Sequence, residues 1–433
     1  MRINKTYIIL FAFLSLALFG YKIQACSMYK ITVDGKTMVG CNEDAWRTTS
    51  SIWFENAKNS REYGAGFTGS RQVGANRTAP QSGMNEKGLA FSRLAAYYPK
   101  QKKTFTNRLI IGNEVDYLTS ILHKCATVKE VKKYIEQYDH SVFLDDVFIY
   151  VDSSGSYLIV EPYTLIEGNE SHYVLSNFCP SITDREQARQ LERYRNGEDF
   201  LNNREVNASL SFCKDLSDTM HVCRSRNGDG TLLTSIWDTQ DKLVNLYFYH
   251  SFDTTVQFNL TAALAKGDHT LSIPDLFPKN SEFERLANYK TPHNTPIFRI
   301  SLVVLVGILT FFVLLIGLFL IRNNSIGISI RAAILIAGMN LLLGGYLFVL
   351  ATNLYIYYFD APYIHYSSNL ISASSYMPFL LLLTIVPFTL YTLKQSKSIK
   401  TKLWIKAMLV SNNMIYIVLI LAFGYWGLFN IWN

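Results

Sequence analysis

Two common binding patterns are missing from this chain of 433 residues. Its six cysteines form no CxxC pair, which argues against a zinc knuckle and against a thioredoxin-type motif. The chain also has no lysine and arginine block of the kind that follows a phosphate backbone, so its net charge of +7 does not indicate nucleic-acid binding. We therefore expect no metal, no cofactor and no nucleic-acid partner.

The composition changes sharply along the chain. Residues 26–290 mix polar and apolar positions as a globular domain does, whereas the remainder holds four long apolar runs. Each run approaches the ~20 residues that a helix needs to cross a bilayer. We predict an all-α membrane domain over residues 291–433, with transmembrane helices at about 299–321, 332–351, 372–393 and 404–428.

Basic residues around the apolar runs indicate the orientation in the membrane. The first loop holds Arg322 and Arg331, and the second loop holds no lysine or arginine. The third loop holds four lysines, namely Lys394, Lys397, Lys400 and Lys402. Because cytoplasmic loops are enriched in basic residues, the first and third loops are predicted to be cytoplasmic and residues 26–298 extracytoplasmic.

Residues 1–25 have the features of a secretory signal. A positive start at Arg2 and Lys5 precedes an apolar stretch over 8–20, which is too short to span comfortably. Cleavage after Ala25 would make Cys26 the first residue of the mature chain. Two alternatives stay open, namely a lipoprotein signal that lipidates Cys26 and an uncleaved anchor. If Cys26 is a thiol nucleophile, five cysteines remain, which allows at most two disulfides or a reduced domain.

A hairpin is predicted directly after Cys26. Residues 27–33 and 36–41 read as strands, and Asp34-Gly35 between them favours a type I′ turn. A two-residue turn brings the far ends of the two strands together. We therefore expect Cys26, Asn42 and Asp44 to be neighbours.

The rest of residues 26–290 predicts strands, then helices, then strands again. Strand patterns occur near 51–55, 63–69, 147–151, 157–161, 172–177, 232–237 and 243–249. Helical patterns occur within 107–139, where Thr127-x-x-Glu130 is a capping box, from 183 onward and over 207–222. Such an order is typical of a layered α+β domain with antiparallel sheets.

An N-terminal cysteine carries a nucleophile and a base on one residue. The thiolate attacks, and the α-amine, with a pKa near 7.7–8.0, can take the thiol proton and later protonate the leaving amine. Asp44 is the candidate that orients the amine. Attack on an amide also needs donors for the oxyanion, and the side-chain amide of Asn177 at a strand end suits that role.

Four motifs in order resemble the choloylglycine hydrolase family of N-terminal-nucleophile (Ntn) hydrolases, which includes bile salt hydrolases and penicillin V acylases. They are the Cys26-to-Asp44 hairpin, the turn at 83–89, the strand pair that ends at Asn177 and the hairpin from Thr231 to Trp237. The resemblance implies a four-layer αββα sandwich. It also implies Cys26 as nucleophile, Asp44 as the residue that holds its amine, Asn177 as oxyanion donor and Arg224, with Arg226 competing, as a late active-site arginine.

The chain departs from the family at two positions. Cys41 stands where bile salt hydrolases have an arginine, so bile salts and penicillin V are doubtful substrates. Arg47 is the candidate replacement, and Asn42 is expected to contact substrate beside it. Ala95 stands near the slot of the family's second oxyanion asparagine, where a backbone N–H is the expected substitute.

We expect a membrane-tethered cysteine hydrolase that cleaves a linear, non-peptide C–N amide of a small N-acyl compound through a thioester. The membrane location makes a lipid-like substrate attractive. One alternative is an acyltransferase that uses the same thioester. The other is a non-catalytic membrane sensor or assembly protein with an Ntn-like binding domain. The sequence leaves the oligomeric state open.

Overall fold

The computed structural model describes residues 26–44, 50–73, 77–102, 105, 107–224, 229–321, 328–353, 356–357 and 368–430. The predicted signal at 1–25 lies outside these ranges. The chain divides into two compact units, one over Gln24–Tyr289 and one that contains residues 290–433. Each unit is described by itself.

The first unit contains a seven-stranded antiparallel sheet in which β1 occupies an interior position. The order is β12-β1-β2-β14-β15-β16, and the short β13 pairs with β14. Its strands are β1 (Ser27–Val33), β2 (Lys36–Asp44), β12 (His172–Leu175), β13 (Cys223–Arg224), β14 (Asp229–Asp238), β15 (Leu243–Phe248) and β16 (Val256–Asn259).

The second sheet has eight antiparallel strands in the order β11-β10-β9-β8-β7-β4-β3-β17. They are β3 (Ser51–Glu55), β4 (Ala65–Gly69), β7 (Ser82–Asn85), β8 (Ala90–Ala95), β9 (Asp146–Val151), β10 (Tyr157–Val160), β11 (Leu165–Gly168) and β17 (His269–Ser272). A separate ribbon pairs β5 (Arg71–Val73) with β6 (Arg77–Ala79).

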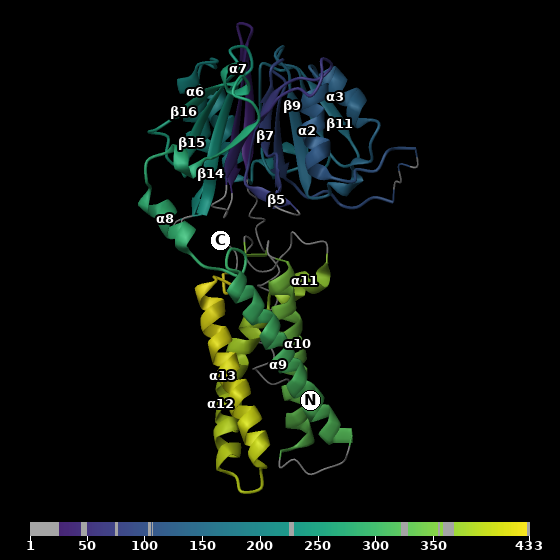
Figure 1. Cartoon of the computed structure of the whole chain (residues 1–433), viewed down its shortest axis with the longest axis vertical. Helices are drawn as coiled ribbons and strands as arrows, with labels where there is room; N and C mark the ends of the chain where they lie inside the picture. Colours follow the sequence, from purple (N-terminus) through teal and green to yellow (C-terminus); the bar gives the residue numbers. More distant parts are fainter. Residues whose placement is uncertain are drawn as a thin grey trace. The chain divides into compact units, whose positions relative to one another are not determined.

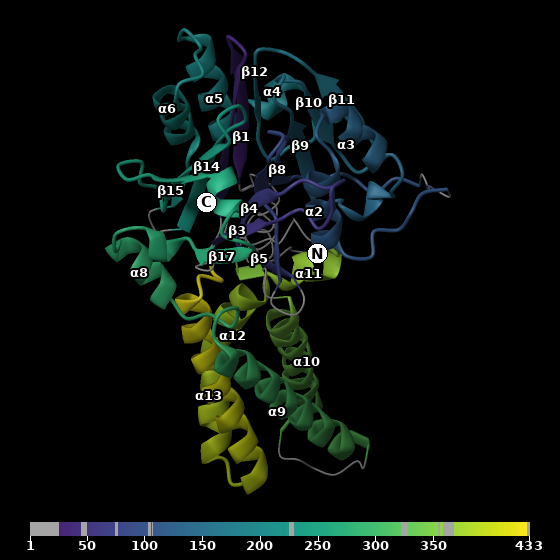
Figure 2. The ribbon, with the colours of Figure 1, turned by 45° about the horizontal axis from the view of Figure 1, so that its top comes forward.

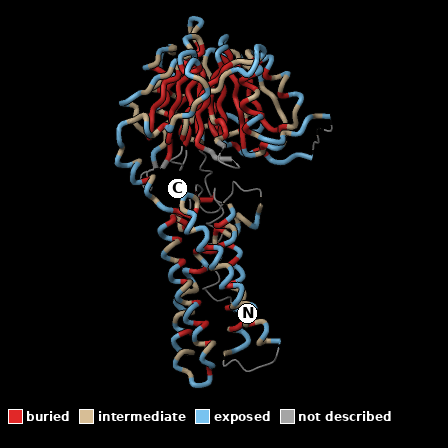
Figure 3. The backbone as a smooth tube through the Cα atoms, in the orientation of Figure 1, coloured by how far each residue is buried: buried red, intermediate tan, exposed pale blue. Residues whose placement is uncertain are grey.

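Alternation along the strands builds three apolar layers. In β9, Val147 and Ile149 face the cluster between the sheets, whereas Phe148 and Tyr150 face α2 and α3. The other sheet packs its outer face against α5 and α6. The main helices are α2 (Glu114–Lys124), α3 (Val128–Ile135), α5 (Glu192–Asn202) and α6 (Leu210–Met220). Figures 1 and 2 show the helices outside the two sheets, and Figure 3 shows the buried strands between them. The predicted α+β class with antiparallel sheets is confirmed.

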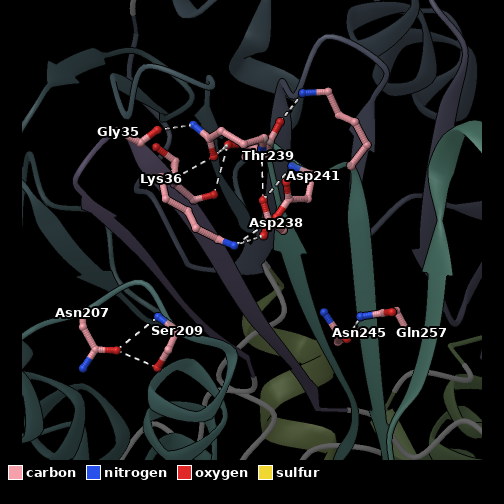
Figure 4. Close-up of polar contacts among 12 residues, drawn as sticks. Gly35, Lys36, Asn207, Ser209, Asp238, Thr239, Asp241, Asn245 and Gln257 are labelled. Carbon is pink, nitrogen blue, oxygen red and sulfur yellow. Dashed lines mark hydrogen bonds and ion pairs between the residues drawn. The ribbon is translucent and has the colours of Figure 1, made fainter.

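The turn that closes the first hairpin has the predicted geometry. Asp34 and Gly35 both have positive φ, at 51° and 75°, as a type I′ turn requires. Lys36 then forms ion pairs with Asp238 at 2.6 Å and Asp241 at 3.1 Å (Figure 4). These contacts attach the start of β2 to the end of β14, so the hairpin is fixed at the end away from Cys26.

Local signals explain most remaining elements. Thr127 caps α3 by accepting from the Glu130 backbone N–H, while the Glu130 carboxylate accepts from Ala126 rather than from Thr127 itself. Shorter elements are α4 (Arg185–Ala188), α7 (Leu260–Leu264), α8 (Ser281–Asn288), η1 (His140–Val142) and η2 (Pro274–Leu276). None of the six cysteines forms a disulfide, so the reduced alternative describes this structure.

The second unit contains four helical segments that are long and apolar enough to cross a membrane, as predicted: Pro296–Ile321, Ile330–Thr352, Asn369–Lys397 and Leu403–Tyr425. They comprise α9 (Pro296–Ile321), α10 (Ile330–Thr352), α11 (Asn369–Ser374), α12 (Met377–Lys397) and α13 (Leu403–Tyr425). Mid-helix polar groups join neighbours: Tyr416 donates to Asn340 at 2.5 Å, and Thr389 donates to Asn413 at 2.9 Å. These bonds agree with the interhelical role expected of membrane asparagines.

Candidate active site

Cys26 lies at the start of an interior strand. Met28 pairs with Cys41 on one side and with Leu175 on the other, so the continued register places Cys26 between Glu43 and Asn177. Its side chain belongs to the cluster between the two sheets and is 6% exposed. The thiol is therefore enclosed by the sandwich at one end of both sheets.

Polar groups surround this thiol. The side-chain amide of Gln81, just before β7, places Nε2 3.6 Å from the Cys26 sulfur. Ser176 donates its hydroxyl to the Cys26 carbonyl at 3.2 Å. The nucleophile candidate thus has an amide donor beside its sulfur and a fixed backbone.

Asp44 ends β2 and is held on both carboxylate oxygens. Arg193 of α5 contacts Oδ2 at 2.5 Å, and Thr231 of β14 donates to Oδ1 at 2.6 Å. Thr231 also accepts from the Val222 backbone N–H at 2.9 Å, which links this carboxylate to the segment before Arg224. The Asp44 side chain is therefore immobile and its charge is partly balanced by Arg193.

The environment disfavours a thiolate at rest. Burial raises the pKa of the Cys26 thiol well above its ordinary value, and the charges of Asp44 and Glu43 raise it further. A hydrogen bond with the Asp44 backbone lowers this pKa, but not enough to offset burial. Since only a thiolate attacks efficiently, this thiol needs a base that takes its proton as attack proceeds.

Asn177 lies just beyond β12 on the same face as Cys26. Its Nδ2 donates to the Ala95 carbonyl on β8 at 2.8 Å, and its Oδ1 accepts from Ser176 at 3.3 Å. The amide is 1% exposed and bridges the two sheets. This position beside Cys26 is compatible with the predicted oxyanion role, which stays a prediction.

Asn42 and Asp44 lie near Cys26 along the strand pair. Their side chains, however, point to the face of β2 opposite the one that carries the Cys26 thiol. Asn42 donates to the Ser217 carbonyl on α6 at 2.9 Å and accepts from Thr234 at 2.7 Å. These bonds use one hydrogen and one lone pair of the Asn42 amide, and its predicted substrate contact stays a prediction. Arg47 lies outside the described residues.

Arg224 is described only as the second residue of β13, and its side chain lies outside the described part of the structure. β13 pairs with β14 in the segment that leads to Thr231. The predicted role of Arg224 therefore stays a prediction.

Three contributors were not predicted from sequence. Glu43 faces the thiol side of β2 and accepts from Ser70, and strand parity could have identified it because Cys26 and Glu43 are opposite in the hairpin. Gln81 and Arg193 come from distant segments, and no local motif marks them. Among the residues that the structure describes, no group of three or more His, Cys, Asp or Glu side chains could hold a metal.

Among the comparisons with known proteins, only the one with solved structures gives matches, and these are weak. No family model matches the chain, and no curated protein does. A variant of conjugated bile acid hydrolase from Clostridium perfringens is similar at 15% identity and a TM-score of 0.45, over 59% of this chain and 97% of that one. Penicillin V acylase from Agrobacterium tumefaciens is similar at 16% identity and a TM-score of 0.43, over 57% and 91%. Similarity at this level does not assign an activity.

Proposed function

We propose that the chain is a cysteine Ntn hydrolase of the choloylglycine hydrolase type, tethered by its four apolar helices. It cleaves a linear, non-peptide C–N amide of an N-acyl compound. The observation that carries the proposal is the placement of Cys26: a buried thiol directly before the interior strand β1, between side-chain amides and carboxylates. The αββα layering agrees with it.

The backbone at Cys26 supports cleavage of the preceding bond. Cys26 has a φ of 91°, in the left-handed region that residues with a Cβ avoid. Such a conformation costs on the order of 1–3 kcal/mol. This dihedral exists only while a residue precedes Cys26, so removal of a leader after Ala25 abolishes the strain and creates the free α-amine.

The proposed reaction begins with proton transfer from the thiol to the α-amine. The sulfur forms a bond to the substrate carbonyl carbon, and the carbonyl electron pair moves onto oxygen. Collapse of this adduct breaks the C–N bond, and the leaving amine receives the proton held by the α-ammonium. Water, deprotonated by the same amine, then releases the acyl group from the thioester. Asp44, itself fixed by Arg193 and Thr231, orients the ammonium.

The distribution of lysine and arginine supports an extracytoplasmic catalytic unit. The basic first and third loops would face the cytoplasm, so residues 26–298 would lie on the other side, where a signal peptidase acts. Tethering at the bilayer favours an acyl substrate that partitions into lipid.

The first test is the mature N-terminus of the purified full chain, measured by N-terminal sequencing and intact mass. We expect Cys26 as an unmodified first residue. A retained leader or a blocked amine would refute the catalytic proposal, because the base would be absent.

The second test is hydrolysis of a panel of N-acyl amides that differ in acyl length and amine. Cys26→Ala should abolish hydrolysis and labelling by a thiol-reactive acyl probe. Cys41→Ala is the matched control, since Cys41 is a buried thiol on the adjacent strand that contacts Ser92. Labelling without hydrolysis, but with transfer to an added amine, would favour the acyltransferase. Neither labelling nor hydrolysis would favour the sensor.

A further inference from the structure

The start of β7 leaves two backbone carbonyls of β8 to be satisfied by side chains. Ser82 pairs with Ser92, and the last main-chain bond toward β7 runs from the Arg93 N–H to the Gln81 carbonyl at 2.7 Å. Beyond it, the Arg93 carbonyl accepts from Gln81 Nε2, and the Ala95 carbonyl accepts from Asn177 Nδ2 at 2.8 Å. Residues two apart on a strand direct their carbonyls the same way. The side-chain amides of Gln81 and Asn177 are therefore bound side by side along one edge of β8.

The orientation of the Gln81 amide is fixed by these contacts. Its backbone N–H donates to the Thr68 carbonyl at 2.8 Å, and its own carbonyl is occupied by Arg93. A carbonyl can only accept, so the Arg93 contact requires the Gln81 nitrogen rather than its oxygen. That nitrogen carries a second hydrogen, and it lies 3.6 Å from the Cys26 sulfur.

We propose that Gln81 is a catalytic residue that donates a hydrogen bond to the oxyanion, beside the one expected from Asn177. This inference rests on the proposed amide hydrolase. When the sulfur bonds to the carbonyl carbon, the electron pair moves to an oxygen only two bonds from that sulfur. A donor held 3.6 Å from the sulfur lies within reach of this oxygen.

The contact gains strength as the reaction proceeds. A neutral thiol is a weak acceptor, whereas the oxyanion is charged and enclosed by the two sheets. Donors that improve only in the transition state accelerate the chemical step, and removal of one typically lowers kcat ~10²–10³-fold.

The test compares two reactions of the same sulfur in the mature full chain. Acylation by a p-nitrophenyl ester passes through an oxyanion, whereas alkylation by iodoacetamide at a saturated carbon does not. Gln81→Met keeps the length of the side chain and removes the donor without adding charge. We expect its Cys26 acylation rate to fall ~10²-fold or more, with alkylation changed less than about threefold.

Gln240→Met is the matched control. Gln240 donates to the Gly35 and Ser153 carbonyls at 2.7 and 2.8 Å, at the turn end of the hairpin, and should alter neither rate. Equal losses of acylation and alkylation in Gln81→Met would assign Gln81 a structural role and overturn the proposal. Unchanged acylation would overturn it as well.

The two proposals fail differently. If wild-type Cys26 is acylated by the ester but hydrolyses no amide, the proposed amide hydrolase is wrong, while the ratio of the two rates still decides the role of Gln81. If amides are hydrolysed equally well by wild type and Gln81→Met, only the role of Gln81 is refuted. If wild-type Cys26 is not acylated at all, both are refuted.

Discussion

Replacement of Arg193 by methionine removes the ion pair with Asp44, and we expect it to lower the melting temperature of the domain. The Arg193–Asp44 contact is 2.5 Å long, and the two side chains are 10% and 2% exposed. Loss of one partner of a buried pair leaves an uncompensated charge and costs about 3–5 kcal/mol. For a domain of 150–250 residues, ~1 kcal/mol corresponds to about 2–4 °C in Tm, so the melting temperature should fall by about 6–20 °C.

The same change should move the pH dependence of the reaction. An Asp44 carboxylate without Arg193 stabilises the charged form of a nearby α-ammonium, so the pKa of the Cys26 amine rises. The base is then protonated up to a higher pH, and the acid limb of the kcat/KM profile should shift upward. The measurements are thermal unfolding of the detergent-solubilised chain and hydrolysis rates across pH 5–10.

Arg189→Met is the control for loss of an arginine from the same region. Arg189 is more exposed and pairs with Glu198 at 2.6 Å and Asp199 at 2.9 Å, so its loss should change the melting temperature little and leave the pH profile in place. If Arg193→Met is no more destabilising than Arg189→Met and its profile does not move, the role assigned to the Asp44 contact is wrong.

Three further changes test the fold that supports the site. Burial lowers the pKa of Lys30 from 10.5 to about 8, so the folded state binds this proton more weakly than the unfolded state. The contribution of Lys30 to stability should therefore rise from about pH 8 to pH 10.5, and urea titrations of wild type and Lys30→Met across this range should differ by that contribution. Gly40→Ala should destabilise the domain strongly, because a Cβ would lie 2.0 Å from the ring of Tyr29, and a melting temperature within a few degrees of wild type would contradict this packing. Tyr416→Phe should cost about 0.6–1.7 kcal/mol in the membrane unit by removing the donor to Asn340, and unfolding in mixed micelles would measure it.

The elements predicted correctly from the sequence are those that depend on residues close together in the chain. The Asp34-Gly35 turn, the register that follows from it and the four apolar helices depend on backbone angles and local hydrophobicity. Strand β17 was not predicted, because its alternation is weak and its pairing with β3 spans more than 200 residues. Helix α8 was not predicted either; its N-terminus is capped by Asn280.

The residues of the candidate site also fall into those that a local pattern can place and those that depend on distant segments. Cys26 and Asn177 could be placed from strand ends, and parity would have assigned Glu43 rather than Asp44 to the thiol face of β2. Arg193 and Gln81 could not be found, because each reaches the site from another layer of the sandwich. Contacts between layers depend on packing that no local pattern encodes.

The interior position of β1 has a consequence for the timing of the leader cleavage proposed above. β1 is the first strand to emerge, yet one of its two partners, β12, ends only at Leu175. About 150 further residues must therefore follow Cys26 before this part of the sheet can close. At a synthesis rate of roughly 5–20 residues per second, this takes roughly 8–30 seconds. If a peptidase removes the proposed leader, the bond before Cys26 is accessible to it during that interval, whereas Cys26 is 6% exposed in the folded domain. The proposed cleavage would therefore have to precede closure of the sheet, and under the proposed function a chain that folded first would keep its leader and lack the free α-amine.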